Sequence, residues 1–185
     1  MASDTQHPEV PGLRIAEGFL PPREQIDLLS AIDAQPWDHS LRRRTQHYGW
    51  RYAYGPGDAG EFLGPLPGWL ERVARRIAPG FDQCIVNEYE PGQGIAAHAD
   101  NPRLFGPRVA GLSLGSATTM EFRRPGRPPV EVRLRPGSLY VMEGDARYLW
   151  THEIAKRKTD KVDGRKVRRG RRVSVTFRSR RPTVY

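Results

Sequence analysis

The last hundred residues alternate between short apolar runs and turn residues, and this alternation constrains the fold more than any other feature. Seven runs with alternating apolar residues predict strands over 82–89, 94–100, 109–114, 118–123, 129–134, 137–142 and 171–178. Pro, Gly and Asn divide these runs. Many short strands bounded by turns are typical of a β-sandwich or a jelly-roll barrel. We therefore predict a mainly β fold of the α+β class, a double-stranded β-helix (jelly roll) with its core over 82–178.

Two amphipathic helices are predicted before the strand series. The first begins after Pro21 and carries Ile26, Leu29 and Ile32 at helical spacing, and the second covers 69–78 and ends at a Pro-Gly pair. Each has one apolar stripe, which must pack against another element. We expect both helices to pack on the outside of the barrel.

The remaining segments are predicted to be irregular, apart from a first strand within 13–19. Residues 1–12 are polar and contain two prolines and a glycine, which predicts a flexible N-terminal arm. A Gly- and Pro-rich loop is expected over 55–68, and residues 13–185 are expected to form a single domain. Eight lysines and arginines crowd into 156–170, and this density of like charge predicts a mobile basic loop.

The net charge favours a polyanionic partner. The chain carries 30 Lys and Arg against 21 Asp and Glu, which gives a net charge of +9 and a pI near 10.2. Nucleic acid is the first partner that such a charge suggests. The alternative is a charged surface that serves only solubility.

A segment over 37–54 combines basic and aromatic residues and is predicted to hold the nucleic acid. Its members are Arg42, Arg43 and Arg44, followed by aromatic residues that include Tyr48, Trp50, Tyr52 and Tyr54. Cations can hold phosphates and aromatic rings can stack on bases. The other interpretation is a solvated charge run followed by aromatic residues of the core.

Composition also excludes several classes of protein. The apolar runs are too short to span a membrane, and the first residues lack the basic-then-apolar signature of a signal peptide, so we expect a cytoplasmic monomer. The single cysteine, Cys84, cannot form an internal disulfide or a thiolate metal cluster. It is expected to be a small core residue.

A candidate metal site begins in the segment over 85–101. His98 and Asp100 stand two residues apart, so on an extended segment both side chains point to one face. Asn87 and Tyr89 have the same spacing on the preceding strand, and a Pro- and Gly-rich turn connects the two runs. Histidine and aspartate are two of the three ligands of the 2-His-1-carboxylate site of non-haem Fe(II) oxygenases.

The third ligand is sought among five histidines. His7 lies in the arm, and His39 and His47 precede the barrel, whereas His152 follows a strand and can reach the barrel interior. We therefore predict a metal site of His98, Asp100 and His152. A lone histidine is more often structural than a ligand, and His-x-Asp alone is a weak motif.

The last strand predicts a second half of the site. Val173, Val175 and Phe177 share one face, so Arg172 and Arg178 share the other face with Ser174 and Thr176. If the apolar face packs against the helices, the two arginines point inward, where a guanidinium needs an anion. The alternative is an exposed edge strand whose charges face water.

A dicarboxylic cosubstrate satisfies both halves of the predicted site. One carboxylate would take a bidentate pair of hydrogen bonds from an arginine, while the 2-oxo acid end would chelate the metal. A hydrolytic zinc site is the alternative for two histidines and an aspartate. It would leave Arg172 and Arg178 unexplained.

Together these residues resemble the AlkB family of Fe(II)/2-oxoglutarate dioxygenases. The resemblance rests on Asn87-x-Tyr89-x-Pro-Gly, His98-x-Asp100, Gly144-Asp-Ala-Arg147 leading to His152, and Arg172-x5-Arg178. Within the family the chain is most similar to the AlkB-type domain of the wobble-uridine tRNA hydroxylase, through Arg-Arg-x-x-x-His47-Tyr48-Gly49 and Arg-Tyr-Leu-Trp-Thr-His.

The resemblance implies a role for each of these residues. His98, Asp100 and His152 would bind Fe(II). Arg172 with Tyr89 would hold the distal carboxylate of 2-oxoglutarate, and Asn87 with Arg178 would contact its metal-side end. The segment around Trp50 and Tyr52 would be part of a nucleotide-recognition lid over 37–54.

The resemblance also implies a reaction. Fe(II), O2 and 2-oxoglutarate would hydroxylate a modified base, and we expect oxidative dealkylation (repair) of alkylated DNA or RNA, on a flipped or single-stranded base. Pro102 stands where family members that demethylate adenine or cytosine often carry an acidic residue. The alternatives are hydroxylation of a wobble-uridine modification in tRNA, hydroxylation of a protein side chain, and a non-catalytic basic nucleic-acid-binding module.

Overall fold

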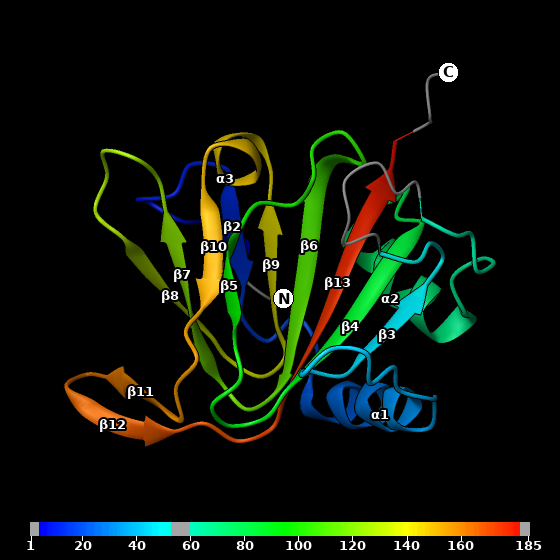
Figure 1. Cartoon of the computed structure of the whole chain (residues 1–185), viewed down its shortest axis with the longest axis horizontal. Coiled ribbons are helices and arrows are strands. Elements are labelled where there is room, and N and C mark those ends of the chain that lie inside the picture. Colours follow the sequence, from blue (N-terminus) through cyan, green and yellow to red (C-terminus); the bar gives the residue numbers. More distant parts are fainter. Residues whose placement is uncertain (1–3, 53–59, 182–185) are drawn as a thin grey trace.

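The computed structural model describes residues 4–52 and 60–181 (Figure 1). The larger sheet has the strand order β1 (Asp4–Gln6), β2 (Leu13–Ala16), β9 (Ser138–Met142), β6 (Phe105–Gly115), β13 (Arg172–Arg180), β4 (Gln83–Tyr89) and β3 (Thr45–Tyr48). The smaller sheet has the order β5 (Ile95–His98), β10 (Thr151–Ile154), β7 (Thr118–Arg123) and β8 (Val130–Leu134). A separate hairpin consists of β11 (Thr159–Val162) and β12 (Arg165–Arg168). The helices are α1 (Pro22–Asp33), α2 (Gly68–Ile77) and the short α3 (Gly144–Tyr148).

The two larger sheets pack face to face around one apolar cluster. Met120 and Phe122 of the smaller sheet belong to the same buried cluster as Val109, Tyr140 and Met142 of the larger one. All strand pairs in both sheets are antiparallel. The prediction of a mainly β jelly roll is confirmed.

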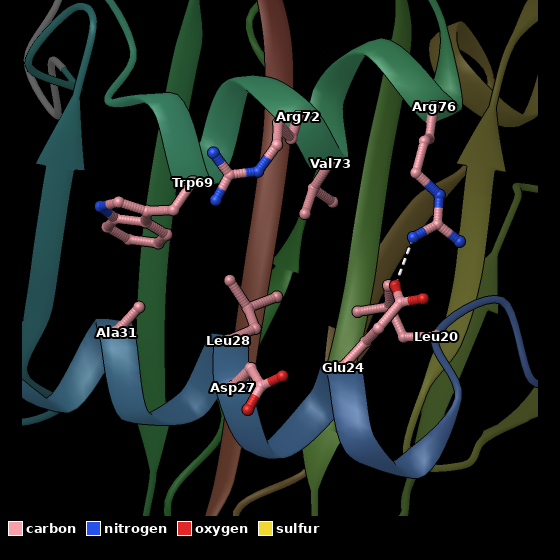
Figure 2. Close-up of a pocket in the computed structure, with 9 residues that line it drawn as sticks. All are labelled: Leu20, Glu24, Asp27, Leu28, Ala31, Trp69, Arg72, Val73 and Arg76. Atoms are coloured by element: carbon pink, nitrogen blue, oxygen red, sulfur yellow. Dashed lines mark hydrogen bonds and ion pairs between the residues drawn. The ribbon is translucent and has the colours of Figure 1, made fainter.

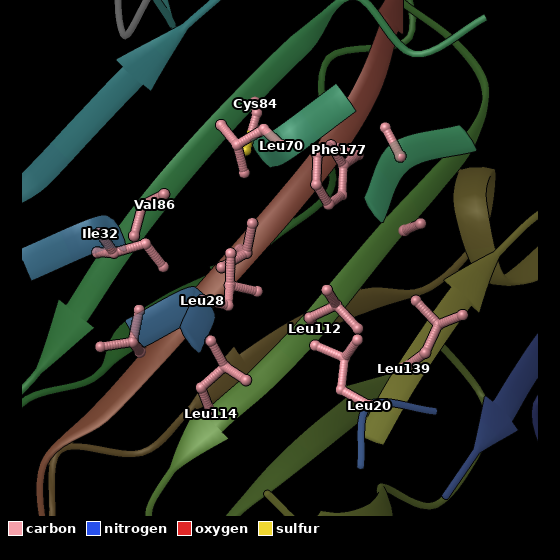
Figure 3. Close-up of a cluster of buried hydrophobic side chains, with 14 of the residues drawn as sticks. Leu20, Leu28, Ile32, Leu70, Cys84, Val86, Leu112, Leu114, Leu139 and Phe177 are labelled. Carbon is pink, nitrogen blue, oxygen red and sulfur yellow. The ribbon is translucent and has the colours of Figure 1, made fainter. Parts of the chain in front are cut away.

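A second core lies between the larger sheet and the helices α1 and α2. Val173, Val175 and Phe177 of β13 are fully buried in this cluster, with Leu28 of α1 and Leu70 of α2 (Figure 3). Burying one side chain of this size stabilises the fold by about 1.5–3 kcal/mol. The helices therefore pack on the outside of the barrel as predicted. On α1, however, Ile26 is 60% exposed, so the buried stripe consists of Leu28 and Ile32.

α1 and α2 lie side by side on that face and leave a groove of about 430 Å³ between them (Figure 2). Trp69 and Val73 of α2 line it opposite Leu28 of α1, and an ion pair joins Arg76 to Glu24 across it. The groove is on the opposite side of the larger sheet from the inward face of β13.

The predicted flexible arm over 1–12 is wrong for its described part. Residues Asp4–Gln6 pair with β2, and Val10 is fully buried. The backbone N–H of Glu143 bonds to the oxygen of Gly12, whose φ is +85°. A Cβ on Gly12 would lie 2.0 Å from the Glu143 oxygen, so only glycine allows this close approach. Polar composition did not prevent order here, because the sheet edge satisfies the backbone groups.

The predicted mobile loop over 156–170 is instead the β11–β12 hairpin. Its two-residue turn is Asp163-Gly164, with φ values of 47° and 77°. Two positive φ angles are typical of a type I′ turn, and Asp-Gly is a common sequence for it. The prediction of a loop followed the basic composition of the segment and overlooked the Asp163-Gly164 turn sequence.

Asp160 fastens the hairpin to the barrel. Its fully buried carboxylate accepts hydrogen bonds from Arg169 and Arg157 within the segment, and from Arg133 and the backbone N–H of Thr119 in the smaller sheet. Burial raises the pKa of Asp160, but the hydrogen bonds from Arg169 and Arg157 lower it below its usual value overall. The carboxylate is therefore ionised at neutral pH and offsets the charge of its arginine neighbours.

We expect Asp160→Asn to cost about 3–5 kcal/mol in the free energy of unfolding, because it leaves the buried Arg169 without its counter-charge. Asp163→Asn, at the exposed turn, makes the same chemical change and is expected to cost less than about 0.5 kcal/mol. Urea unfolding monitored by circular dichroism measures both. Equal stability of the two variants would contradict the role of Asp160.

No helix in the described residues is long and apolar enough to cross a membrane.

Candidate active site

The structure brings the three predicted metal ligands together. β5 and β10 are antiparallel neighbours, and their register places His98 directly opposite His152, with ring centres 4.4 Å apart. Asp100 follows the end of β5 and is 1% exposed, and its Oδ2 lies 3.9 Å from Nε2 of His152. Two histidines from different strands and one carboxylate thus converge on one space.

Their protonation states suit metal binding. Burial favours a higher pKa for Asp100, but the charges of Arg178 and the two histidines lower its pKa to about 2. Burial, His98 and Arg178 lower the pKa of His152 to about 3. At neutral pH Asp100 is therefore ionised and His152 is neutral, which are the forms that bind a metal ion.

One oxygen of Asp100 has no partner. Oδ1 accepts a hydrogen bond of 2.6 Å from Nε of Arg178, whereas the buried Oδ2 has none. Nδ1 of His98 lies 2.8 Å from the oxygen of Ala96. No set of three His, Cys, Asp or Glu side chains over 4–52 and 60–181 closes into a metal-binding cluster as it stands. The donor types and the orphaned oxygen nonetheless fit a 2-His-1-carboxylate site.

Arg172 forms a second, separate pole of the site. It lies on β13, which pairs with β6 on one side and β4 on the other, so the alternative of an exposed edge strand is wrong. Its Nε donates to Oγ of Ser113 at 2.9 Å, while Nη1 and Nη2 are buried without a partner. The side chain lies over the ring of Tyr89 at 5.3 Å.

An unpaired buried guanidinium calls for an anion. Burial lowers the pKa of Arg172, yet a guanidinium stays protonated in proteins. Two parallel N–H groups match the two oxygens of a carboxylate. Thr118, whose buried Oγ1 also lacks a partner, lines the same small cavity. The sequence did not indicate Ser113 or Thr118, because Ser113 reaches Arg172 through the pairing of β6 with β13, and Thr118 meets it from the smaller sheet at a shared cavity.

Arg178 and Asn87, the other two predicted cosubstrate contacts, already have protein partners. Arg178 contacts Asp100 and also donates to Gln83 at 3.2 Å. Asn87 accepts a hydrogen bond of 3.0 Å from Nε of Arg43. Both line a cavity of about 600 Å³ that opens beside His98.

The described lining of this cavity is rich in small and cationic residues. Its members are Arg43, Tyr52, Ile85, Asn87, Gly94, Ile95, Ala96, Ala97, His98, Ala99, Asn101, Lys156 and Arg178. No carboxylate belongs to this lining. Tyr52 stacks on Phe105 with ring centres 5.6 Å apart, and Arg178 lies over its ring.

Of the predicted nucleotide-binding residues, only Arg43 and Tyr52 reach the cavity. Tyr48 pairs with Cys84, which faces the helix core, so its ring packs against Trp69 instead. The period of two along β3 sends His47, not Tyr48, to the other face. The expectation for Tyr48 is therefore wrong.

The remaining members of the predicted surface are also placed elsewhere. Trp50 packs on Phe62 and lies under Arg180 at 4.0 Å. Arg44 pairs with Glu88, with one Nη2–Oε1 distance of 2.9 Å, and lies over Trp37. Arg42 is exposed. Tyr54 lies outside the described residues.

Arg147 is a supporting residue whose role the sequence did not reveal. Its guanidinium is 2% exposed, donates to the backbone oxygen of Asp100 at 2.6 Å and contacts the oxygens of Asn101 and Gly106. It therefore fixes the backbone at the predicted carboxylate ligand. The Gly144-Asp-Ala-Arg147 motif was the only signal for it.

Comparison with known proteins decides the family. The family model of the 2OG-Fe(II) oxygenase superfamily matches residues 12–178. The Bos taurus protein named "Alpha-ketoglutarate-dependent dioxygenase alkB homolog 7, mitochondrial" is 40% identical over 181 residues, which cover 89% of this chain and 77% of that protein. This chain belongs to the AlkB family of 2-oxoglutarate- and Fe(II)-dependent oxygenases.

This AlkB-family oxygenase is also similar to a second named relative and to a solved structure. The Xenopus tropicalis protein named "tRNA (carboxymethyluridine(34)-5-O)-methyltransferase alkbh8" is 37% identical over 82% of this chain, but the match spans only 26% of that protein. The solved structure of OsALKBH1 has a TM-score of 0.71 at 18% identity, and the match covers 96% of this chain and all of that one. The second similarity confirms the fold.

The chain is thus a dioxygenase that uses Fe(II), 2-oxoglutarate and O2, as predicted. Both cofactor requirements agree with the residues present. The orphaned oxygen of Asp100 beside two histidines fits Fe(II), and the unpaired N–H groups of Arg172 fit a distal carboxylate.

Proposed function

We propose that this AlkB-family oxygenase oxidises a modified base in DNA or RNA, and that the reaction is oxidative dealkylation of a damaged base. The observation that carries the proposal is the cavity beside His98. Arg43 and Lys156 at its wall suit phosphates, and Tyr52 offers an aromatic face. A cavity of about 600 Å³ is large enough for one base and its sugar.

In this proposal His98, Asp100 and His152 hold Fe(II), and Arg172 with Tyr89 holds the distal carboxylate of 2-oxoglutarate. Asn87 and Arg178 contact its metal-side end. When bound, Fe(II) with 2-oxoglutarate and O2 supplies the oxidant for hydroxylation of a C–H bond. A hydroxylated N-methyl group then leaves as formaldehyde and releases the unmodified base.

The chain's own residues position the reacting groups. Arg178 holds Oδ1 of Asp100 and leaves Oδ2 for the metal, while Arg147 holds the backbone of the same residue. The β13 register sets Arg172 six residues from Arg178, on the same inward face. Because Arg172 would hold the distal carboxylate and Arg178 the metal-side end, 2-oxoglutarate would bind in one orientation.

The charge of the cavity favours a neutral or anionic base. Its described lining has no carboxylate and includes Arg43 and Lys156, besides Arg178, which is paired with Asp100. A base that alkylation has made cationic, such as 1-methyladenine, would meet like charge there. A neutral alkylated base, such as 3-methyluracil or 1-methylguanine, would not. Pro102 adds no acidic group near Asp100.

The test is to incubate the protein with Fe(II), 2-oxoglutarate and matched oligonucleotides that carry a cationic or a neutral methylated base. Nucleoside mass spectrometry is expected to show that neutral methylated bases are restored, with formaldehyde released. Turnover of 2-oxoglutarate to succinate with every nucleoside unchanged would overturn the proposed substrate class, and a protein-substrate screen would then follow.

The second candidate is hydroxylation of a wobble-uridine modification in tRNA. It is favoured by the similarity to the Xenopus protein, whose name refers to carboxymethyluridine in tRNA, and by the cations of the cavity, which suit a carboxylate. Bulk tRNA in the same assay separates the two: a uridine derivative heavier by one oxygen indicates hydroxylation without dealkylation.

A further inference from the structure

The β11–β12 hairpin presents one face that is almost entirely cationic. In its register Lys161 lies opposite Lys166, and Thr159 lies opposite Arg168, so these four side chains share a face. Lys161, Lys166 and Arg168 are exposed, and none forms an ion pair within the described residues. Like charges directly opposite each other destabilise a strand pair. The free protein therefore carries an unfavourable pair that an anion would relieve.

The other face of the hairpin carries Asp160, which fastens it to the barrel, and the exposed Arg165 opposite Val162. Asp160 and Val167 pair across it, and Asp160 takes all the ion pairs described above, including that with Arg133 of β8. The inward cations Arg157 and Arg169 thus have a counter-charge, whereas the outward cations have none. The outward cations therefore lie on a hairpin that Asp160 holds against the barrel, and not on a mobile loop.

The cationic face continues from the mouth of the cavity. Lys156 lines the cavity itself. The stem of Lys158 lies over the β4–β5 turn, since a Cβ on Gly92 would be 3.6 Å from its Cγ. Figure 1 shows the hairpin projecting as an arm from the end of β10, the strand that carries His152. A four-residue strand extends about 13 Å, which reaches several phosphates along a nucleic acid.

We propose that Lys161, Lys166 and Arg168 bind the phosphates of the nucleic acid next to the base held in the cavity. This inference rests on the proposed function, because a base held in the cavity would belong to a nucleic acid whose phosphates pass the hairpin. The outward face has no apolar side chain to enter a membrane, which argues against a lipid surface. The hairpin then extends the phosphate contacts of Arg43 and Lys156 at the cavity wall, whereas Arg44 is already paired with Glu88.

The test compares two triple variants of the full chain. K161Q/K166Q/R168Q removes the outward face, and the matched control R23Q/R72Q/R75Q removes three exposed arginines from α1 and α2; each lowers the net charge from +9 to +6. Binding of a fluorescent 15-nucleotide single strand is measured by anisotropy over a series of salt concentrations. Each phosphate contact contributes about 0.7 to the slope of log K against log salt for single strands. The hairpin variant is expected to flatten that slope by about 2, and the control to leave it within about 0.5 of the wild type.

Three outcomes overturn the inference. These are equal slopes for both variants, which would show an effect of overall charge only; an unchanged slope for the hairpin variant; and binding of phosphatidylserine vesicles but not of the oligonucleotide. Oxidation of a modified trinucleotide, too short to reach the hairpin, tests the proposed function separately. If the trinucleotide is not oxidised but the hairpin variant still flattens the salt dependence of oligonucleotide binding, the proposed reaction is wrong. The inferred phosphate-binding surface would then still be supported.

Discussion

Replacement of His98 by alanine is expected to abolish the Fe(II)-dependent conversion of 2-oxoglutarate to succinate. His98 is a half-buried residue at the end of β5, so its replacement would remove a donor of the proposed metal site without opening the core. Mutating a residue that only hydrogen-bonds to a metal ligand typically lowers metal affinity or activity by about 10–100-fold. Loss of a ligand itself should therefore reduce turnover by more than about a hundredfold. Succinate formation and iron content after desalting are the two measurements.

His39→Ala is the matched control for this experiment. His39 is exposed in the segment before β3, so His39→Ala is the same substitution at a position away from the site. It is expected to keep wild-type turnover and iron content. Undiminished turnover in His98→Ala would show that the metal lies elsewhere.

Arg172→Gln is expected to weaken 2-oxoglutarate binding by about 2–5 kcal/mol, which corresponds to roughly 30-fold to several thousand-fold in KM. The reason is that the distal carboxylate of 2-oxoglutarate would lose the two Nη donors of Arg172, which have no protein partner. Inhibition by pyruvate, a 2-oxo acid without the distal carboxylate, should be almost unchanged. This pair of ligands separates the role of Arg172 from general damage to the site.

The same substitution has an expected effect on stability that runs the other way. Without cosubstrate, the buried Arg172 carries a charge that no protein group neutralises, and removing such a charge can stabilise a fold by about 1–4 kcal/mol. We expect a higher Tm for cosubstrate-free Arg172→Gln and a smaller rise on adding 2-oxoglutarate.

Arg171→Gln serves as the neighbouring control. Arg171 is on the opposite side of the strand, where it pairs with Asp33 and Glu88. Its loss should lower stability and leave the affinity for 2-oxoglutarate unchanged. If Arg171→Gln weakened cosubstrate binding as much as Arg172→Gln, the carboxylate site would not be specific to Arg172.

Local patterns were enough to predict which side chains of the candidate site share a strand face. The spacing of His98 and Asp100 and the alternation along 172–178 depend only on the period of an extended strand, and the structure places them on inward faces. The same rule failed for Tyr48, because it says that neighbours face opposite ways but not which way is inward. Pairing with β4 decided that, and it turned Tyr48 toward Trp69.

Long-range contacts decided what composition had suggested wrongly. The polar segment before Leu13 is ordered because β2 offers it a free edge, and the basic segment before Gly170 is a hairpin because Asp160 gathers its arginines. Ser113, Thr118 and Arg147 came to the site through partners 47–59 residues away or through a shared cavity. No local pattern carries that information.

The sequence by itself therefore determined the barrel class and the family, and it nominated the candidate metal and cosubstrate donors, since each depends on short-range periodicity or on a motif. Only the tertiary structure decided which donors are free. Asp100 Oδ2 and the Nη groups of Arg172 lack partners, whereas Arg44 and Arg178 have them. The physical reason is that a charge acquires its function from the groups buried around it, and strands distant in sequence supply those groups.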